Sequence, residues 1–254
     1  YARSGFLPVE LAPMRTVTAT RYVTPLREGG SLPAIVEADD EGLYVLKFRG
    51  AGQGVNALVA ELIAGEIGRA AGLRVPEIVF VHVDAELART EPDPEIQDLI
   101  LASAGLNLGF DYLPGAVMFD PVAGQPDGGL ASDIVWFDAF VMNVDRTARN
   151  ANLLVWHRQL WLIDHGAALY FQHDWQGGKE RSRDPFPRIR DHVLLPFADQ
   201  LPAADARLRA RLTAAACAQA VELVPEAWLP AGPRRRGFAE FLAQRLESSA
   251  TFVQ

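Results

Sequence analysis

The most concentrated group of polar side chains lies in "NVDRTARNANLL", residues 143–154, between two apolar runs. It contains Asp145 and Asn150, five residues apart, and Asp164 follows in "LIDHG". Two short strands, "LLVW" and "LWLID", are predicted between them and would form a hairpin. Because a hairpin returns the chain to its starting end, Asp145, Asn150 and Asp164 could converge. The local sequence alone is equally compatible with a plain polar turn between a helix and a hairpin.

Two carboxylates and an amide carbonyl are hard oxygen ligands of the kind that Mg²⁺ takes, together with water and substrate phosphates. No His or Cys completes a zinc-binding set around them. If the three side chains meet, the chemistry that they favour is the handling of a divalent cation and phosphate groups.

A lysine adds to this pattern. Of the 24 basic residues, 22 are Arg, and only Lys47 and Lys179 are Lys. A Lys is a compact point charge, whereas the planar fork of Arg is bulkier. The retention of Lys47 at the end of the predicted strand "LYVLKF" therefore points to a role that Arg could not fill. The alternative is a surface Lys at a strand end.

Composition bounds the class of protein. The 254 residues are 49% hydrophobic and 22% charged, which is typical of a globular protein with a sizeable core. The net charge of −8 gives no overall basic footprint, so direct nucleic-acid binding is not expected. The single cysteine, Cys217, excludes an internal disulfide framework. No apolar run is long enough to span a bilayer, and no signal pattern opens the chain, so a cytoplasmic protein without membrane contact is expected.

The elements that must position these residues are predicted to fall into a strand-rich first half and a helix-rich second half. Residues 16–49 read as strands, with a hairpin across Asp39–Gly42. A Gly-, Pro- and Asp-rich loop is expected at 119–132, followed by a helix capped by Ser132 or Asp133. Further strands are predicted at 75–83 and 106–115, and further helices at 55–72, 203–224 and 234–248. This order indicates an α+β fold in two lobes.

Taken together, the motifs resemble the protein-kinase superfamily, and the HipA-like kinases more than ordinary Ser/Thr kinases. In that superfamily a catalytic Asp precedes an Asn by five positions, and a metal-binding Asp-x-Gly follows a hairpin. This chain has Asp145, Asn150 and Asp164-His165-Gly166, with Lys47 on an upstream strand. The resemblance covers roughly residues 16–200 and implies a strand-rich N-lobe at 1–113 and a helical C-lobe at 114–254.

The resemblance also implies roles. Lys47 would contact the ATP phosphates, held by Glu61 or, as the second candidate, Glu66. Asp145 would orient the acceptor hydroxyl, and Asn150 and Asp164 would bind Mg²⁺. The list of further candidates comprises Arg149 for charge neutralisation, Gly29 and Gly30 over the nucleotide, Tyr112 and Leu113 at an adenine-binding hinge, and Gly50, Gly52 and Gly54 as a second glycine-rich loop. His165 is expected to be structural.

The motif departs from the family pattern Asp-x-His-x-Lys-Asn at two positions. Thr147 stands in place of the His and Arg149 in place of the Lys, and both positions bear on the fine positioning of the γ-phosphate. No His-Arg-Asp motif is present, so a conventional eukaryotic-type kinase is not expected. The P-loop class is excluded because no Walker sequence occurs.

The expected function is ATP- and Mg²⁺-dependent phosphoryl transfer, with a Ser/Thr hydroxyl of a protein as acceptor. A kinase for a small-molecule alcohol or lipid head group, a nucleotide-binding pseudokinase and an adenylyltransferase are the alternatives. The polar stretch 172–191 is where a substrate loop would fall. It carries five basic residues among four acidic ones. It is either a solvated loop or a docking segment for an acidic or phosphate-bearing substrate.

Overall fold

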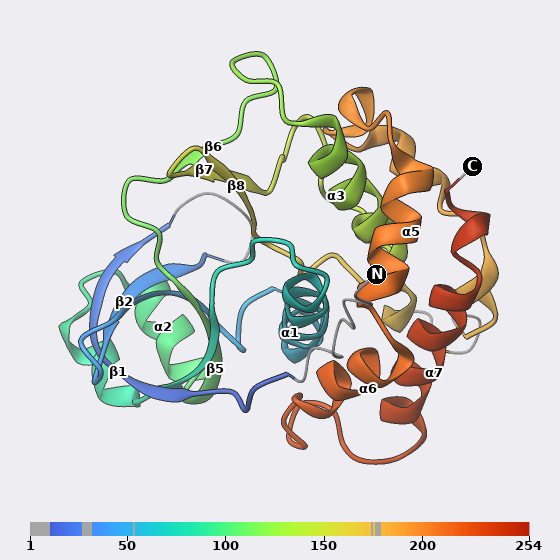
Figure 1. Ribbon diagram of the computed structural model, residues 1–254. Coiled ribbons are helices and arrows are strands. Elements are labelled where there is room, and N and C mark those ends of the chain that lie inside the picture. The colour runs from blue at the N-terminus through green and yellow to red at the C-terminus, as the bar shows by residue number, and fades with distance from the viewer. Residues whose placement is uncertain (1–10, 27–31, 53, 174, 176–178, 254) are drawn as a thin grey trace, which may run out of the picture.

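The computed structural model describes residues 11–26, 32–52, 54–173, 175 and 179–253. It has a β-barrel on one side and a group of helices on the other, with the helix α1 (Val55–Ala70) between them (Figure 1). A small three-stranded sheet lies beyond the barrel, beside the helices. The mixed α+β architecture, with strands first and helices later, confirms the predicted fold class.

The barrel closes in the strand order β1-β2-β3-β5-β4. The strands are β1 (Thr16–Pro25), β2 (Ala34–Ala38), β3 (Leu43–Lys47), β4 (Ile78–Val83) and β5 (Gly105–Asp111). β2 and β3 form the expected hairpin across residues 39–42, and β1 closes the barrel by pairing parallel to β4. The register of β3 against β5 pairs Lys47 with Leu108, which fixes the lysine at the end of a central strand.

α1 follows β3 through a tight glycine-rich turn. Gly54 precedes the first helical residue with φ of 65°, a conformation that glycine adopts without steric cost. The helix stops at Ala70, and Gly72, with φ of 83°, follows as expected for a C-terminal stop. Nearly all of α1 is buried, so the helix is fixed on several faces and can hold a side chain in a defined place.

The second half begins with the small sheet and continues as helices. β6 (Val117–Met118), β7 (Leu153–Trp156) and β8 (Gln159–Leu162) form the sheet in that order. The β7–β8 hairpin confirms the two predicted strands on either side of "HRQ". The helices are α3 (Gly128–Phe140), α5 (Leu201–Arg211), α6 (Ala214–Glu222) and α7 (Pro233–Glu247). α3 precedes the polar stretch 143–152 directly.

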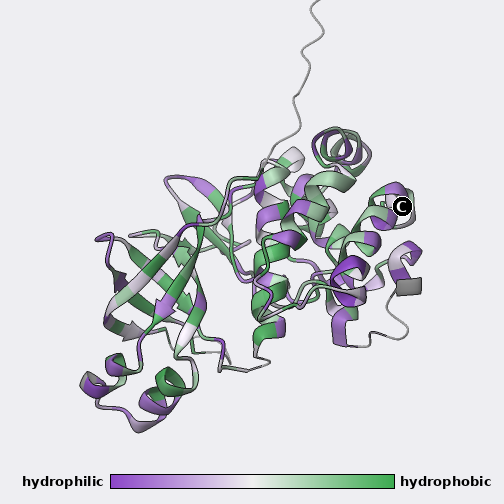
Figure 2. Cartoon of the chain, turned by 90° about the horizontal axis from the view of Figure 1, so that it is seen from below, coloured by the Kyte–Doolittle hydropathy of each residue, from purple (hydrophilic) through white to green (hydrophobic). Residues whose placement is uncertain are grey.

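Two hydrophobic cores hold these parts. One fills the barrel, where Ile96 and Ile100 of the helix α2 (Pro94–Ala102) join the strand residues. The other joins α1 to α3, α6 and α7, and Cys217 lies buried within it. Hydrophobic residues accordingly run through the barrel strands and the helices beside them (Figure 2). Because α1 shares its core with helices of the second half, it ties the two halves together.

Two helix boundaries differ from the predictions. α3 begins at Gly128 and is capped by Asp127, whose side chain accepts from the Leu130 N–H at 3.0 Å, so Ser132 and Asp133 lie inside the helix. The single helix predicted over 203–224 is two helices, because Leu212 is extended and Thr213 caps α6. The strand predicted at 75–83 begins only at Ile78.

The boundary between lobes at residue 113 stays a prediction. β5 ends at Asp111, and residues 112–116 connect the barrel to β6. In the part of the chain that the structure describes, no helix combines the length and apolar character that crossing a membrane requires.

The cap of α3 gives a test of the corrected boundary. We expect Asp127→Ala to lower the free energy of unfolding by about 1 kcal/mol, because the Leu130 N–H loses its acceptor. Urea denaturation against Asp98→Ala, an exposed aspartate of α2, measures the difference. Equal stability of the two variants would contradict the assigned cap.

Candidate functional site

The centre of the candidate site is the ammonium group of Lys47. Its Nζ donates to Glu61 Oε1 at 2.5 Å and to Asp164 Oδ1 at 2.7 Å. The lysine comes from the end of β3, Glu61 from the middle of α1, and Asp164 from the residues after β8. Three segments that are far apart in sequence therefore meet at one buried cation.

Charge and burial compete in this group. Glu61 is 1% exposed, whereas 44% of the Asp164 side chain is exposed. Burial raises the pKa of Glu61 to about 7. The Asp164 carboxylate adds to this shift, and the Lys47 ammonium opposes it. Asp164, nearer to solvent, stays ionised, and Lys47 lowers its pKa to about 2 against the effect of burial. The two carboxylates raise the pKa of Lys47 despite its burial, so the lysine remains charged.

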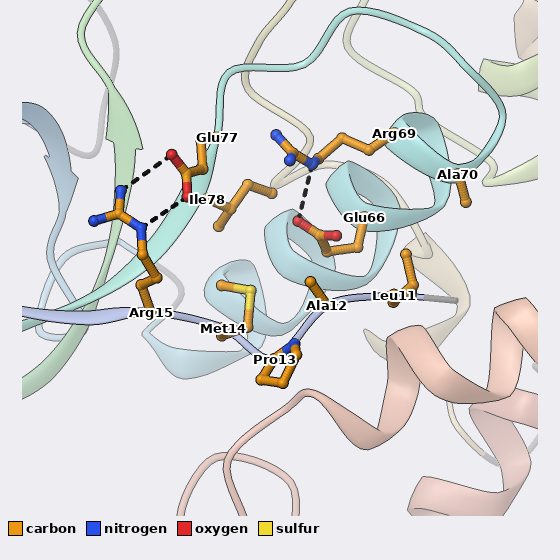
Figure 3. A pocket seen from close by; sticks show the side chains of 10 residues that line it. All are labelled: Leu11, Ala12, Pro13, Met14, Arg15, Glu66, Arg69, Ala70, Glu77 and Ile78. Carbon is orange, nitrogen blue, oxygen red and sulfur yellow. Dashed lines mark hydrogen bonds and ion pairs between the residues drawn. The ribbon is translucent and has the colours of Figure 1, made fainter. Parts of the chain in front are cut away.

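The structure distinguishes the two glutamates of α1. Glu61 contacts Lys47, and Glu66 contacts Arg69, whose Nε lies 3.4 Å from Glu66 Oε1. Glu66 lines a separate cavity of about 270 Å³ between α1, residues 11–15 and the start of β4 (Figure 3). The five-residue spacing places the two side chains on different faces of the helix, so only Glu61 reaches the lysine.

His165 fixes Glu61 through its main chain. Its backbone N–H donates to Glu61 Oε2 at 2.7 Å, so both carboxylate oxygens of Glu61 have donors. The imidazole is fully buried against Phe137, with ring centroids 6.0 Å apart. Burial lowers the pKa of His165 to about 3, which keeps the ring neutral. This agrees with a structural role for the residue.

Asp145 and Asn150 are also in direct contact. Asn150 Nδ2 donates to Asp145 Oδ2 at 2.8 Å, and the backbones of Thr147 and Asn150 bond each other across a tight turn. Asn143 Oδ1 accepts from the Asp145 N–H at 3.1 Å. The turn therefore holds the side chains of Asp145 and Asn150 next to each other.

A buried polar network, which sequence reasoning missed, holds this turn in place. Asp138 of α3 is fully buried and accepts from Arg146 Nε at 2.5 Å and from Asn143 Nδ2 at 3.0 Å. His192 Nε2 lies 2.9 Å from the same carboxylate. Because the Leu194 N–H donates to His192 Nδ1, the proton of the imidazole is on Nε2 and points to Asp138. Burial opposes ionisation of Asp138, but the Arg146 guanidinium and the hydrogen bond from His192 outweigh it and lower the pKa of Asp138.

Arg146 connects the two parts of the site. Its Nη1 donates to the carbonyl oxygen of Asn152, and it lies 3.3 Å from the carbonyl oxygen of Ile163, the neighbour of Asp164. The Ile163 N–H also donates to the Asn152 carbonyl at 3.1 Å. The loop of Asp145 and the segment of Asp164 are thus joined through one guanidinium. A lone Asp within the apolar run "WFDAFVM" was the signal in the sequence.

The remaining candidates are placed less directly. Arg149 is exposed, and no ion pair found in the described part of the chain involves it. Tyr112 and Leu113 lie in the connection after β5, where the Tyr112 N–H donates to the Leu43 carbonyl and Leu113 is buried. Gly29 and Gly30 lie outside the described residues. Gly50, Gly52 and Gly54 form the turn between Lys47 and α1.

Comparison with known proteins supplies independent findings. A family model described as HipA-like kinase matches residues 20–252. A comparison with curated proteins gave no match.

Solved structures show the fold. A proinflammatory kinase of Helicobacter pylori, CtkA, is 14% identical with a TM-score of 0.59, covering 94% of this chain and 96% of that one. A Golgi casein kinase with Mn/ADP bound is 11% identical with a TM-score of 0.53, covering 96% of this chain and 73% of that one. A second structure of a Golgi casein kinase has a TM-score of 0.51 at 11% identity, covering 96% and 72%. The fold is therefore protein-kinase-like.

The raised pKa of Glu61 predicts a pH dependence of stability. Between its ordinary value of 4.5 and about 7, the folded protein keeps a proton on Glu61 that the unfolded chain has lost. The free energy of unfolding of the wild type, relative to that of Glu61→Gln, should therefore fall as the pH rises through this window. The expected decrease is on the order of 1–3 kcal/mol, and the difference levels off above the window. Urea denaturation of both proteins at several pH values tests this. A difference that stays constant or grows with pH would contradict it.

The network around Asp138 predicts a strong coupling. Asp138→Asn leaves the Arg146 guanidinium buried without its counter-charge, which should cost roughly 3 kcal/mol or more. In the double variant with Arg146→Met no buried charge is left over, so its loss of stability should be smaller than the sum of the two single losses. Chemical denaturation of the four proteins measures the coupling, and simple additivity would show that the pair does not act as a unit.

Proposed function

The chain belongs to the HipA-like kinase family, and from this premise we propose that it is an ATP- and Mg²⁺-dependent kinase that phosphorylates a Ser or Thr hydroxyl of a protein. The observation that carries the proposal is the Lys47 ammonium held between Glu61 and Asp164. A fixed cation beside an exposed carboxylate is what a nucleotide phosphate and its metal ion require.

Lys47 is proposed to contact the α- and β-phosphates of ATP. Glu61 positions the ammonium, since its carboxylate is itself held by the His165 N–H and cannot swing away. The Lys47 ammonium is largely buried, with 11% of the side chain exposed, so it loses little conformational entropy when a phosphate arrives. Low exposure also strengthens its attraction to the phosphate oxygens.

Asn150 and Asp164 are the proposed Mg²⁺ ligands. The Asn150 side chain donates its amide N–H to Asp145, so its amide oxygen is proposed to be the atom that binds the cation. Among the described residues, no group of three or more His, Cys, Asp or Glu forms a metal site by itself. This fits Mg²⁺, which takes few protein oxygens and completes its shell with water and phosphates. When bound, the ion supplies charge neutralisation of the phosphates.

Asp145 is proposed to orient the acceptor hydroxyl. Its Oδ2 accepts from Asn150 and its backbone is fixed by Asn143, so the carboxylate has a defined direction. Phosphoryl transfer depends mainly on positioning and charge stabilisation, so a strong base is not needed. Arg149, exposed on the same turn, is proposed to neutralise charge on the transferred group. Tyr112 and Leu113 are proposed to hold adenine through their backbone.

Calorimetry of ATP binding, with and without Mg²⁺, tests the proposal directly. We expect Mg²⁺-dependent binding by the wild type and a loss of affinity of roughly tenfold or more in Asp164→Ala, because a metal ligand and a partner of Lys47 are removed. Asp98→Ala on α2 is the matched control and should bind like the wild type.

The outcome also separates the alternatives. The absence of nucleotide binding in the wild type would refute the proposed function. Binding without transfer to any protein or small-molecule alcohol would identify a pseudokinase. Intact mass of an acceptor after incubation with ATP distinguishes an added phosphoryl group from an added adenylyl group.

A further inference from the structure

We propose that the short turn η4 (Pro187–Asp191) is a docking site beside the catalytic loop for acidic residues of a protein substrate, with Arg188 and Arg190 as its contacts. This inference deepens the proposed function and rests on it, because it names the substrate class: a segment that carries Asp or Glu next to the acceptor hydroxyl. Four observations support it.

The first observation is the position of η4. His192, the residue after the turn, pairs with Thr147 of the catalytic loop in an antiparallel bridge. The Val193 N–H donates to the Arg146 carbonyl at 3.1 Å, and the His192 ring bonds Asp138. The arginines of η4 are thus two and four residues away from a contact with the loop that carries Asp145. The segment that carries them is therefore joined to the loop of Asp145 by main-chain contacts.

The second observation is the orientation of the side chains. Phe186, just before the turn, is buried, and Ile189 packs partly buried against the main core. Arg188 and Arg190, on either side of Ile189, are exposed. The turn is therefore anchored by its apolar residues and presents its arginines to solvent.

The third observation is rigidity. Pro185 and Pro187 flank Phe186 and fix their own φ angles. The Ile189 and His192 N–H groups bond main-chain carbonyls within the segment. A preorganised backbone loses little entropy when a substrate binds, whereas a loose loop would have to be ordered first.

The fourth observation is charge. No ion pair found within the described residues engages Arg188 or Arg190. The whole chain carries −8, so its average field repels an acidic segment and binding of one requires a local cluster of cations. Arg presents a planar fork that matches a carboxylate with two hydrogen bonds, which favours acidic side chains as the occupant. The exposed Arg149 follows two residues after Thr147, the bridge partner of His192.

The test compares two fluorescein-labelled peptides. In one peptide a single Ser is flanked by Glu residues, and in the other the same Ser is flanked by Gln residues. Fluorescence anisotropy at low salt gives their affinities for the full chain, and phosphoryl transfer gives their KM values. We expect tighter binding of the Glu peptide, and a weakening of about tenfold in R188E/R190E. R188K/R190K, which keeps the charges, should lose much less. R236E on α7 reverses the charge of one exposed arginine away from η4 and is compared, per reversed charge, with R188E/R190E.

The results separate this inference from the proposed function. ATP binding by R188E/R190E should equal that of the wild type, since the site of Lys47 is untouched. Equal binding of the two peptides by the wild type, or an equal loss in R236E, would overturn the docking site. If the wild type bound no ATP, the proposed function would fail, and the anisotropy comparison would still decide whether η4 binds acidic segments.

Discussion

The structure depends on one constraint: a single ammonium must balance two carboxylates that come from distant parts of the chain. Lys47 reaches Glu61 across 14 residues and Asp164 across 117 residues. Burial makes the arrangement costly if any partner is displaced, because an unpaired charge would remain in a low-dielectric environment. The position of α1 relative to the barrel, and of the β8 end relative to both, is therefore specified at the site itself as well as by the hydrophobic cores.

The preference for arginine has a structural use away from this centre. Arg146, Arg235 and Arg245 are all buried, and each donates to several main-chain carbonyls. Arg245 joins the end of α3 to residues 182–184, and Arg235 holds the end of α6. A guanidinium has five N–H donors in a fixed plane, which suits this work better than an ammonium. Lysine is retained where a compact charge lies between two carboxylates.

Sequence reasoning found the parts of the site that lie in recognisable order and missed those that depend on packing. The order of Lys47, Asp145, Asn150 and Asp164 was visible because each follows a clear strand or loop signal. Glu61 was preferred to Glu66 as the partner of Lys47, but the choice depends on how α1 is rotated about its axis. The sequence does not reveal this rotation, because α1 is buried on several faces. The contacts of Asp138 depend on tertiary structure, and the break before Thr213 was hidden by the surrounding alanines.

The packing of α1 has a consequence for how the protein is made. Glu61 lies on a helix whose apolar surface is covered partly by α6, a segment more than 140 residues later in the chain. During synthesis α1 emerges before β4 and β5, and its partner surface is complete only after residues 214–222 have left the ribosome. The packing that fixes Glu61 beside Lys47 is therefore completed late. A chain that ends before residue 214 lacks the part of this packing that α6 supplies.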